Sequence, residues 1–182
     1  MKTLTNYIKE SQRINEGLLG DIIMKLLDTG LSWLGSASKF IADNLVSATS
    51  EMWKTAKGVT EEGWKYLADK SNIRYAGPPK NERDFVKYIN PFFEEKNADK
   101  RNQNIDEIFK ELKNYNTDEQ TLEFMYLSTR MQSAFITLSD ENASKKQLKD
   151  ADKTLNEIAS KNNILKKEIE EFRAKLNNKD NK

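Results

Sequence analysis

Residues 148–176, LKDADKTLNEIASKNNILKKEIEEFRAKL, carry the most regular hydrophobic pattern of the chain. The pattern repeats every seven residues, and two positions of nearly every repeat are apolar. Such a repeat places the recurring side chains on one face of an α-helix. The spacing therefore predicts a coiled-coil-like helix over residues 139–176, with an interaction face made of Leu148, Leu155, Ile158, Asn162, Leu165, Ile169, Phe172 and Leu176.

The same repeat leaves two arrangements open for this helix. In a parallel two-stranded coiled coil, an Asn on the seam such as Asn162 fixes the pairing of the chains at some cost in stability. Glu168 would then meet Arg173 of a second copy, which favours a homo-oligomer, whereas Lys161 would meet Lys166, which opposes it. Alternatively, the helix folds back on a helix over residues 117–138 as an antiparallel hairpin, because the short gap between them is typical of such turns.

Residues 80–138, which precede this helix, are predicted to form a series of shorter helices. Residues 94–104 are almost entirely polar, which predicts an exposed loop. Asn104 and Thr117 are each followed three residues later by Glu or Gln, and this spacing predicts two helix starts. The second of these helices has an apolar stripe that predicts a central core helix, formed by Phe124, Leu127, Met131, Phe135 and Leu138.

A glycine and two prolines, Gly77, Pro78 and Pro79, mark the clearest boundary in the chain. Proline has no backbone N–H and fixes φ, so it ends a helix and stiffens the connection that follows. The chain is therefore expected to have two helical parts, with an amphipathic helical region over residues 17–76 before the boundary.

The strongest amphipathic pattern of that region lies in residues 17–35, GLLGDIIMKLLDTGLSWLG. Its apolar face consists of Leu19, Ile22, Ile23, Leu26, Leu27 and Leu34. Such a face packs against other helices or lies on a membrane surface. The charges on the opposite face, Asp21, Lys25 and Asp28, sum to minus one. Packing is favoured, because helices on a membrane surface usually present Lys or Arg to anionic lipid.

The composition excludes most classes of enzyme. The chain of 182 residues has no Cys and no His, which removes thiolate nucleophiles, disulfides, the commonest general base and the commonest transition-metal ligands. We therefore expect no enzymatic activity, no metal and no cofactor. Lys and Arg total 30 against 29 Asp and Glu, so the net charge of +1 does not favour nucleic acid, and no sequence-specific nucleic-acid partner is expected.

The periodicities together predict an all-α protein. No segment shows sustained alternation of apolar and polar residues bounded by turn signals, so no strand is predicted. The expected molecule is elongated, with two helical parts and a C-terminal heptad helix, and residues 177–182 are expected to form a disordered tail.

The first seventeen residues, MKTLTNYIKESQRINEG, carry a pattern of another kind. Met1, Lys2 and Thr3 are followed by an aromatic residue at position 7 and by Ile8 and Glu10. This segment resembles the capsid-targeting leader of internal head proteins of T-even-type tailed bacteriophages. In that family the leader carries the protein into the assembling prohead core. A prohead protease then cuts after Glu in an Ile or Leu, any residue, Glu pattern that a small residue follows.

Two matches to this cleavage pattern lie inside the leader. Ser11 follows the match from Ile8 to Glu10, and Gly17 follows the match from Ile14 to Glu16. The bare pattern also occurs in three other places, 105–107, 155–157 and 169–171, but there a bulky Ile or Phe follows.

The resemblance implies a structural phage protein, either an internal head cargo or a prohead core component, with residues 1–16 removed by a cut after Glu16. Its implied partners are capsid or core proteins and the prohead protease, and its implied place is the virion interior after assembly in the host cytoplasm. The residues also leave two alternatives: a membrane-active protein that uses the helix over residues 17–35, and a helical adaptor that binds partners through its C-terminal heptad face.

Overall fold

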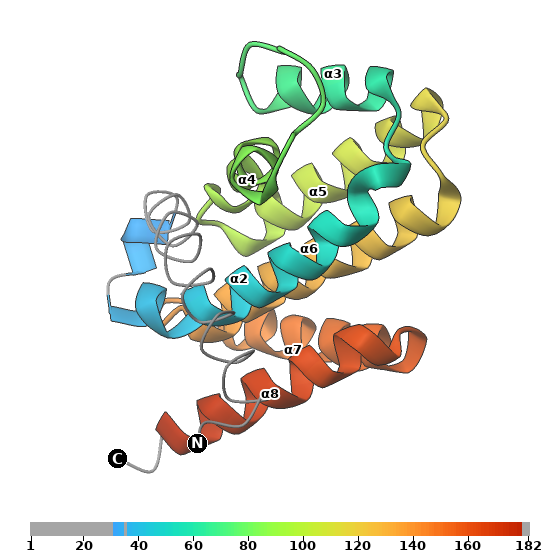
Figure 1. The fold of residues 1–182 in the computed structure, drawn as a ribbon. Helices are drawn as coiled ribbons and strands as arrows, with labels where there is room; N and C mark the ends of the chain where they lie inside the picture. The colour runs from blue at the N-terminus through green and yellow to red at the C-terminus, as the bar shows by residue number, and fades with distance from the viewer. Residues whose placement is uncertain (1–30, 35, 180–182) are drawn as a thin grey trace, which may run out of the picture.

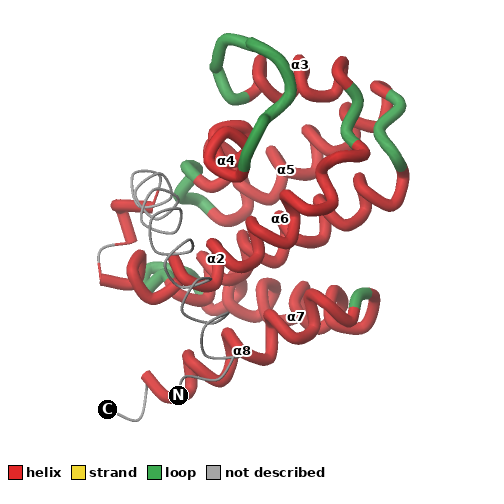
Figure 2. Tube along the Cα trace, in the orientation of Figure 1, coloured by secondary structure: helices red, strands yellow, loops and turns green. Residues whose placement is uncertain are grey.

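Helices account for all the regular structure in the described part of the chain. The computed structural model describes residues 31–34 and 36–179, and Figure 2 shows helices joined by short loops, with no strand among these residues. The α-helices are α2 (Ser36–Thr55), α3 (Glu61–Lys70), α4 (Glu82–Ile89), α5 (Ala98–Leu112), α6 (Glu119–Ser139), α7 (Lys145–Lys161) and α8 (Asn163–Lys179). Short 3-10 turns are η1 (Ser32–Leu34), η2 (Ala56–Gly58), η3 (Asn90–Phe93) and η4 (Lys113–Tyr115). The prediction of an all-α fold is thus confirmed.

Helix α6 lies at the centre of the bundle and packs against α2, α5, α7 and α8 (Figure 1). Between Thr121 and Thr137 every residue is buried except Glu123, Tyr126 and Arg130. A helix whose uncharged positions extend around most of its circumference can be covered by neighbours on several sides. The predicted central core helix is therefore confirmed.

Two helix starts differ from those expected. Asn97 caps α5, and its Oδ1 accepts a hydrogen bond from the backbone N of Lys100 at 3.1 Å. The exposed loop predicted over residues 94–104 is present only over residues 94–97, and the prediction was wrong from Ala98 onward, where α5 begins. Asn104 lies inside α5 rather than at its start. Helix α6 is capped by Asp118 and not by Thr117, because Asp118 Oδ2 accepts from the backbone N of Thr121 at 2.9 Å.

The heptad segment forms two helices instead of one. Asn162 ends α7 and caps α8, and its Oδ1 accepts hydrogen bonds from the backbone N atoms of Ile164 and Leu165 at 3.0 and 3.1 Å. The prediction of a continuous helix over residues 139–176 was therefore wrong. The helix is interrupted at Asn162 because Asn has a low helix propensity and a side chain that competes for backbone N–H groups.

The folded-back arrangement of α7 agrees with one of the two predicted alternatives. Helices α6 and α7 pack along each other across the short connection 140–144 and both line a shared depression, so they are antiparallel. Helix α8 then folds back on α7 and contacts α2 and α6 (Figure 1). It continues to Lys179, so residues 177–179 belong to α8 and not to the expected tail, and residues 180–182 lie outside the described residues.

The residues around Gly77 form a loop between α3 and α4, but they do not separate two cores. Gly77 has a φ of +113°, which favours glycine because it has no Cβ. The buried apolar residues form one cluster that extends from Leu31 to Phe172 across the loop. The described helices on both sides of this loop thus share a single core, whereas the sequence suggested two helical parts.

Aromatic side chains hold α2, α3 and α4 together on their side of this core. The ring of Phe85 in α4 lies 5.5 Å from Trp53 of α2 and 6.1 Å from Trp64 of α3, measured between ring centroids. Trp64 also contacts Tyr88 edge to face at 5.2 Å. Aromatic pairs at such distances add to the free energy of area burial, so these rings are packing anchors.

Candidate functional sites

The heptad residues proposed as an interaction face lie inside the chain's own core. Leu155, Leu165 and Phe172 have no exposed surface, and Ile158 and Ile169 are almost as deeply buried. Leu148, Asn162 and Leu176 are partly exposed. The Phe172 ring stacks on Phe135 of α6 with centroids 4.1 Å apart. This face is therefore occupied by α2, α6 and the facing helix of the α7–α8 pair.

Most of the residues predicted at the N-terminal sites lie outside the described residues. This applies to the cleavage residues Ile8, Glu10, Ser11, Ile14, Glu16 and Gly17, and to the amphipathic residues Leu19, Ile22, Ile23, Leu26 and Leu27. Leu34, the last residue of the predicted amphipathic face, is partly buried and packs against the core. Leu31 beside it is 1% exposed. The end of this segment thus contacts protein, as the packing interpretation predicts.

The three other matches to the cleavage pattern lie in helices of the folded body. Their first residues are Ile105 in α5, Leu155 in α7 and Ile169 in α8, and each is at most 1% exposed. Proteases cut preferentially at exposed, weakly held segments. These matches are consequently shielded both by helical backbone and by burial of the side chain that the pattern requires.

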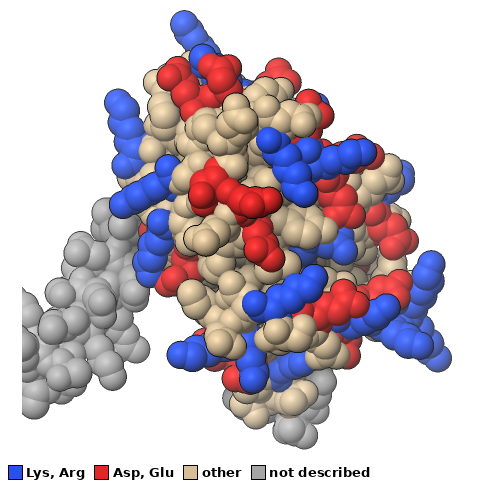
Figure 3. Space-filling view, turned by 90° about the vertical axis from the view of Figure 1, so that its right-hand side faces the viewer, with Lys and Arg blue, Asp and Glu red and all other residues tan. Residues whose placement is uncertain are grey.

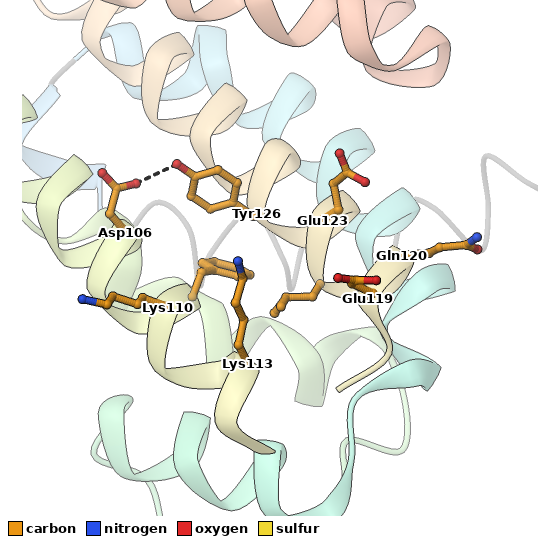
Figure 4. Close-up of a pocket in the computed structure, with 9 residues that line it drawn as sticks. Asp106, Lys110, Lys113, Glu119, Gln120, Glu123 and Tyr126 are labelled. Atoms are coloured by element: carbon orange, nitrogen blue, oxygen red, sulfur yellow. Dashed lines mark hydrogen bonds between the residues drawn. The ribbon is translucent and has the colours of Figure 1, made fainter. Parts of the chain in front are cut away.

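A surface hollow of about 550 Å³ lies between α5 and the first half of α6 (Figure 4). Its floor is formed by the buried apolar residues Phe109 and Leu122. In Figure 4, Lys110 and Gln120 point away from each other at opposite ends of the hollow. The rim therefore carries both signs of charge around a small apolar floor, and its charged residues are Asp106, Lys110, Lys113, Glu119 and Glu123.

Some polar groups of this hollow are joined to one another by a hydrogen bond and an ion pair. The Tyr126 hydroxyl donates to Asp106 Oδ1 at 2.8 Å, and Arg130 Nη1 lies 3.7 Å from the same oxygen. Burial, followed by the hydrogen bond to Asp106, raises the pKa of Tyr126, so the hydroxyl stays protonated at neutral pH. Asp106 thus has partners within the chain, and the hollow offers a small apolar contact surface bordered by charged side chains.

The most deeply buried charged group is Arg101 of α5, with no exposed surface. Its Nε donates to Ser133 Oγ at 2.8 Å, and Nη2 donates to Thr137 Oγ1 at 2.7 Å and to the Ser133 carbonyl at 3.2 Å. Nη1 donates to the carbonyls of Glu95 and Lys96 at 2.8 and 3.2 Å. The guanidinium thus joins the loop before α5 to the second half of α6.

Every acceptor around Arg101 is neutral. Burial lowers the pKa of Arg101 to about 10, against the opposing charges of Asp140 and Glu95, so the group remains a cation at neutral pH. All five guanidinium hydrogens have an acceptor within the chain. No donor is left for a ligand, and Arg101 is a structural residue. The sequence contained a signal for it, because Arg101 precedes Ile105, Phe109 and Leu112 on the buried face of α5 at helical spacing.

The surface charge agrees with the balanced composition. Figure 3 shows Lys and Arg interspersed with Asp and Glu over the face it presents, without a continuous patch of one sign. Among the described residues no group of three His, Cys, Asp or Glu is placed to hold a metal ion. None of the described helices is both long and apolar enough to span a bilayer.

Comparisons with known proteins add no assignment. No protein-family model, no curated protein and no solved structure matches this chain.

Proposed function

We propose that this protein is an internal structural component of a tailed-phage head, carried into the assembling particle by residues 1–16 and trimmed after Glu16. The observation that carries the proposal is the contrast among the five matches to the cleavage pattern. The matches that end at Glu10 and Glu16 are followed by Ser11 and Gly17, whereas the other three are followed by bulky residues.

The fold also distinguishes the matches that lie in the folded body from the match at Glu16. The three matches with bulky following residues are helical and their first side chains are buried, whereas the match at Glu16 lies fifteen positions before Leu31, where the described core begins. A cut after Glu16 would leave every residue of the described core, from Leu31 to Phe172, in one chain. A protease with this specificity would therefore release a chain that contains all of the described helices.

The dense α-helical body is also suited to a packaged structural role. One apolar cluster joins α2 to α8, and the sites described above hold no convergent catalytic groups. The heptad face that an adaptor would use is covered within the chain. We therefore favour the head protein over the adaptor and over the membrane-active protein.

The test is mass spectrometry of purified mature particles and of the lysate from which they come. We expect chains that begin at Gly17 inside the particle. In a Glu10→Gln, Glu16→Gln double variant the packaged chain should remain uncut, while Glu157→Gln, which alters a match inside α7, should be trimmed like the natural chain. Full-length chains found only outside the capsid would overturn the proposal.

A fusion of residues 1–16 to a reporter protein tests targeting independently of cleavage. The reporter should enter particles with the fused segment and stay outside without it. A reporter that remains outside in both cases would remove the targeting role, whatever happens at Glu16.

A further inference from the structure

The apolar stripe of α7 continues in register into α8. Ala151 and Ile158 are buried on α7, Leu165 and Phe172 are buried on α8, and each is seven residues from the next. Only Asn162 is non-helical between the two helices. A turn that merely joins two helices has no need to keep this spacing. Because it is kept, all of these side chains would still share one face if Asn162 became helical.

A small set of hydrogen bonds holds the bend at Asn162. Its side-chain oxygen accepts from the backbone N atoms of Ile164 and Leu165, and its own backbone N donates to the Ile158 carbonyl at 3.1 Å. Asn162 is extended, with φ −142° and ψ 117°. A change in the backbone torsions of this one region would merge α7 and α8, and the helical bonds gained would replace the cap.

We infer that α8 exchanges between two copies of this chain, with Asn162 as the hinge. In the exchanged dimer each chain has one straight helix from Lys145 to Lys179, about 50 Å long. Each α8 lies on the other copy in the position it occupies in the single chain. Exchange of an identical element is a low-cost route to a dimer, because it creates the same contacts that the monomer already has.

The contacts of α8 define the geometry of this dimer. Arg173 Nη2 lies 2.6 Å from Asp152 Oδ1 and 2.8 Å from Asn156 Oδ1, so α7 and α8 are antiparallel. After exchange the same pairing would join two long antiparallel helices that cross near Asn162. Phe172 would stack on Phe135 of the partner subunit. This is a different dimer from a parallel coiled coil, which would leave the α2 and α6 surfaces uncovered.

The hinge controls the balance between the two forms, because the buried contacts are the same in both. Asn162→Ala removes the cap on α8 and raises the helix propensity of the hinge, and both changes favour the straight helix. Two hinges straighten in each dimer, so the free-energy change at one hinge contributes twice to the free energy of association. We expect the association constant to rise roughly tenfold or more. A Gly-Ser-Gly-Ser insertion after Asn162 should have the opposite effect, since a flexible loop lets α8 reach its own chain without strain.

The experiment is size-exclusion chromatography with light scattering on the full chain, refolded at low and at high concentration. The natural chain should give a monomer at low concentration and a dimer fraction after refolding at high concentration. Asn162→Ala should increase this fraction, the insertion should abolish it, and Asn163→Ala, an exposed neighbour at the start of α8, should behave like the natural chain. The exchanged dimer should also persist on dilution, because its separation requires α8 to undock.

Two results would overturn the inference. One is a natural chain and an Asn162→Ala variant that both stay monomeric after refolding at high concentration. The other is a dimer that the insertion leaves unchanged, since that dimer would form through an outer surface. If Asn162→Ala fails to fold, the natural chain and the insertion variant decide the question by themselves.

Discussion

Helix α6 and the α7–α8 pair are buried in opposite ways. Helix α6 is enclosed by four other helices, and its buried residues include Ser128, Thr129, Gln132 and Ser133. In α7 only Ala151, Leu155 and Ile158 are buried, and the rest of the helix surface is largely charged and exposed. One helix is thus buried on most sides with polar groups included, whereas the other buries a single apolar stripe.

These four buried polar residues of α6 are tolerated because they have hydrogen-bond partners. Gln132 Oε1 accepts from Thr49 Oγ1 of α2 at 3.2 Å, and Thr129 Oγ1 donates to the Met125 carbonyl at 2.7 Å. Ser133 accepts from Arg101. Buried polar groups destabilise a fold unless they are hydrogen-bonded. The comparison teaches that α6 depends on matched polar contacts from several helices, while the α7–α8 pair depends on apolar contact along one face.

The largest effect is expected from removing the polar link at the centre. Arg101→Met should lower the free energy of unfolding by about 4 kcal/mol, because the carbonyls of Glu95, Lys96 and Ser133 lose a charged donor. Urea denaturation measures this change. Lys100→Met, at an exposed neighbouring position, is the matched control and should alter stability little. Equal effects of the two substitutions would contradict the structural role of Arg101.

A smaller and more local effect is expected from the apolar face of α8. Phe172→Ala removes a fully buried ring stacked on Phe135 and should cost about 3 kcal/mol. Because α8 is the last described helix, we expect hydrogen exchange to accelerate in α8 while α6 remains protected. Lys166→Ala, exposed on the same helix, serves as the control. Uniform acceleration throughout the chain would show that α8 is not a separate unit of stability.

A still smaller loss of stability is expected where η2 approaches the start of α6. A Cβ at Gly58 would lie 2.1 Å from Thr121 Oγ1 and 2.8 Å from Thr121 Cβ. Gly58→Ala must therefore displace the start of α6, with an expected loss of about 2 kcal/mol. Thermal unfolding measures it, with the exposed Lys57→Ala as control. An unchanged melting temperature would show that α6 does not depend on this contact.

The smallest effect concerns Glu168, which lies half-buried between α8 and α2 and accepts from Ser47 Oγ at 2.9 Å. Burial raises the pKa of Glu168, the nearby carboxylates Glu171 and Glu51 add to this rise, and Ser47 and Lys175 oppose it. Protonated Glu168 therefore contributes fully to the free energy of unfolding below the pKa that it has in the unfolded chain. This contribution is lost as the pH rises through its pKa in the folded chain.

Glu168→Gln removes this titration while keeping an acceptor for Ser47. The variant should melt about 1 to 2 °C higher than the natural chain near neutral pH, and the difference should vanish in acid below the unfolded pKa of Glu168. Scanning calorimetry at several pH values measures it, and Glu170→Gln on the exposed side of α8 is the control. A difference that is independent of pH would rule out the titration of Glu168 as the cause.

How well each region could be predicted depends on whether its helices are buried on one face, as α7 and α8 are, or on most sides, as α6 is. The buried residues of α7 and α8 were identified from spacing, because a helix buried on one face shows its period in the sequence. The break at Asn162 was not, since the apolar register passes through it unchanged. The site at Arg101 was missed because its acceptors come from residues 95, 96, 133 and 137, which only the fold brings together. The cleavage sites after Glu10 and Glu16 stay predictions.

The sequence by itself determined that the chain is helical, which residues form the apolar stripes, and that Cys and His chemistry is absent, because periodicity and composition are local properties. The tertiary structure decided that residues on both sides of Gly77 share one core, that α8 folds back on α7, and that a buried cation sits among neutral acceptors. These features depend on contacts between residues far apart in the chain, and their free energies arise only when the helices pack.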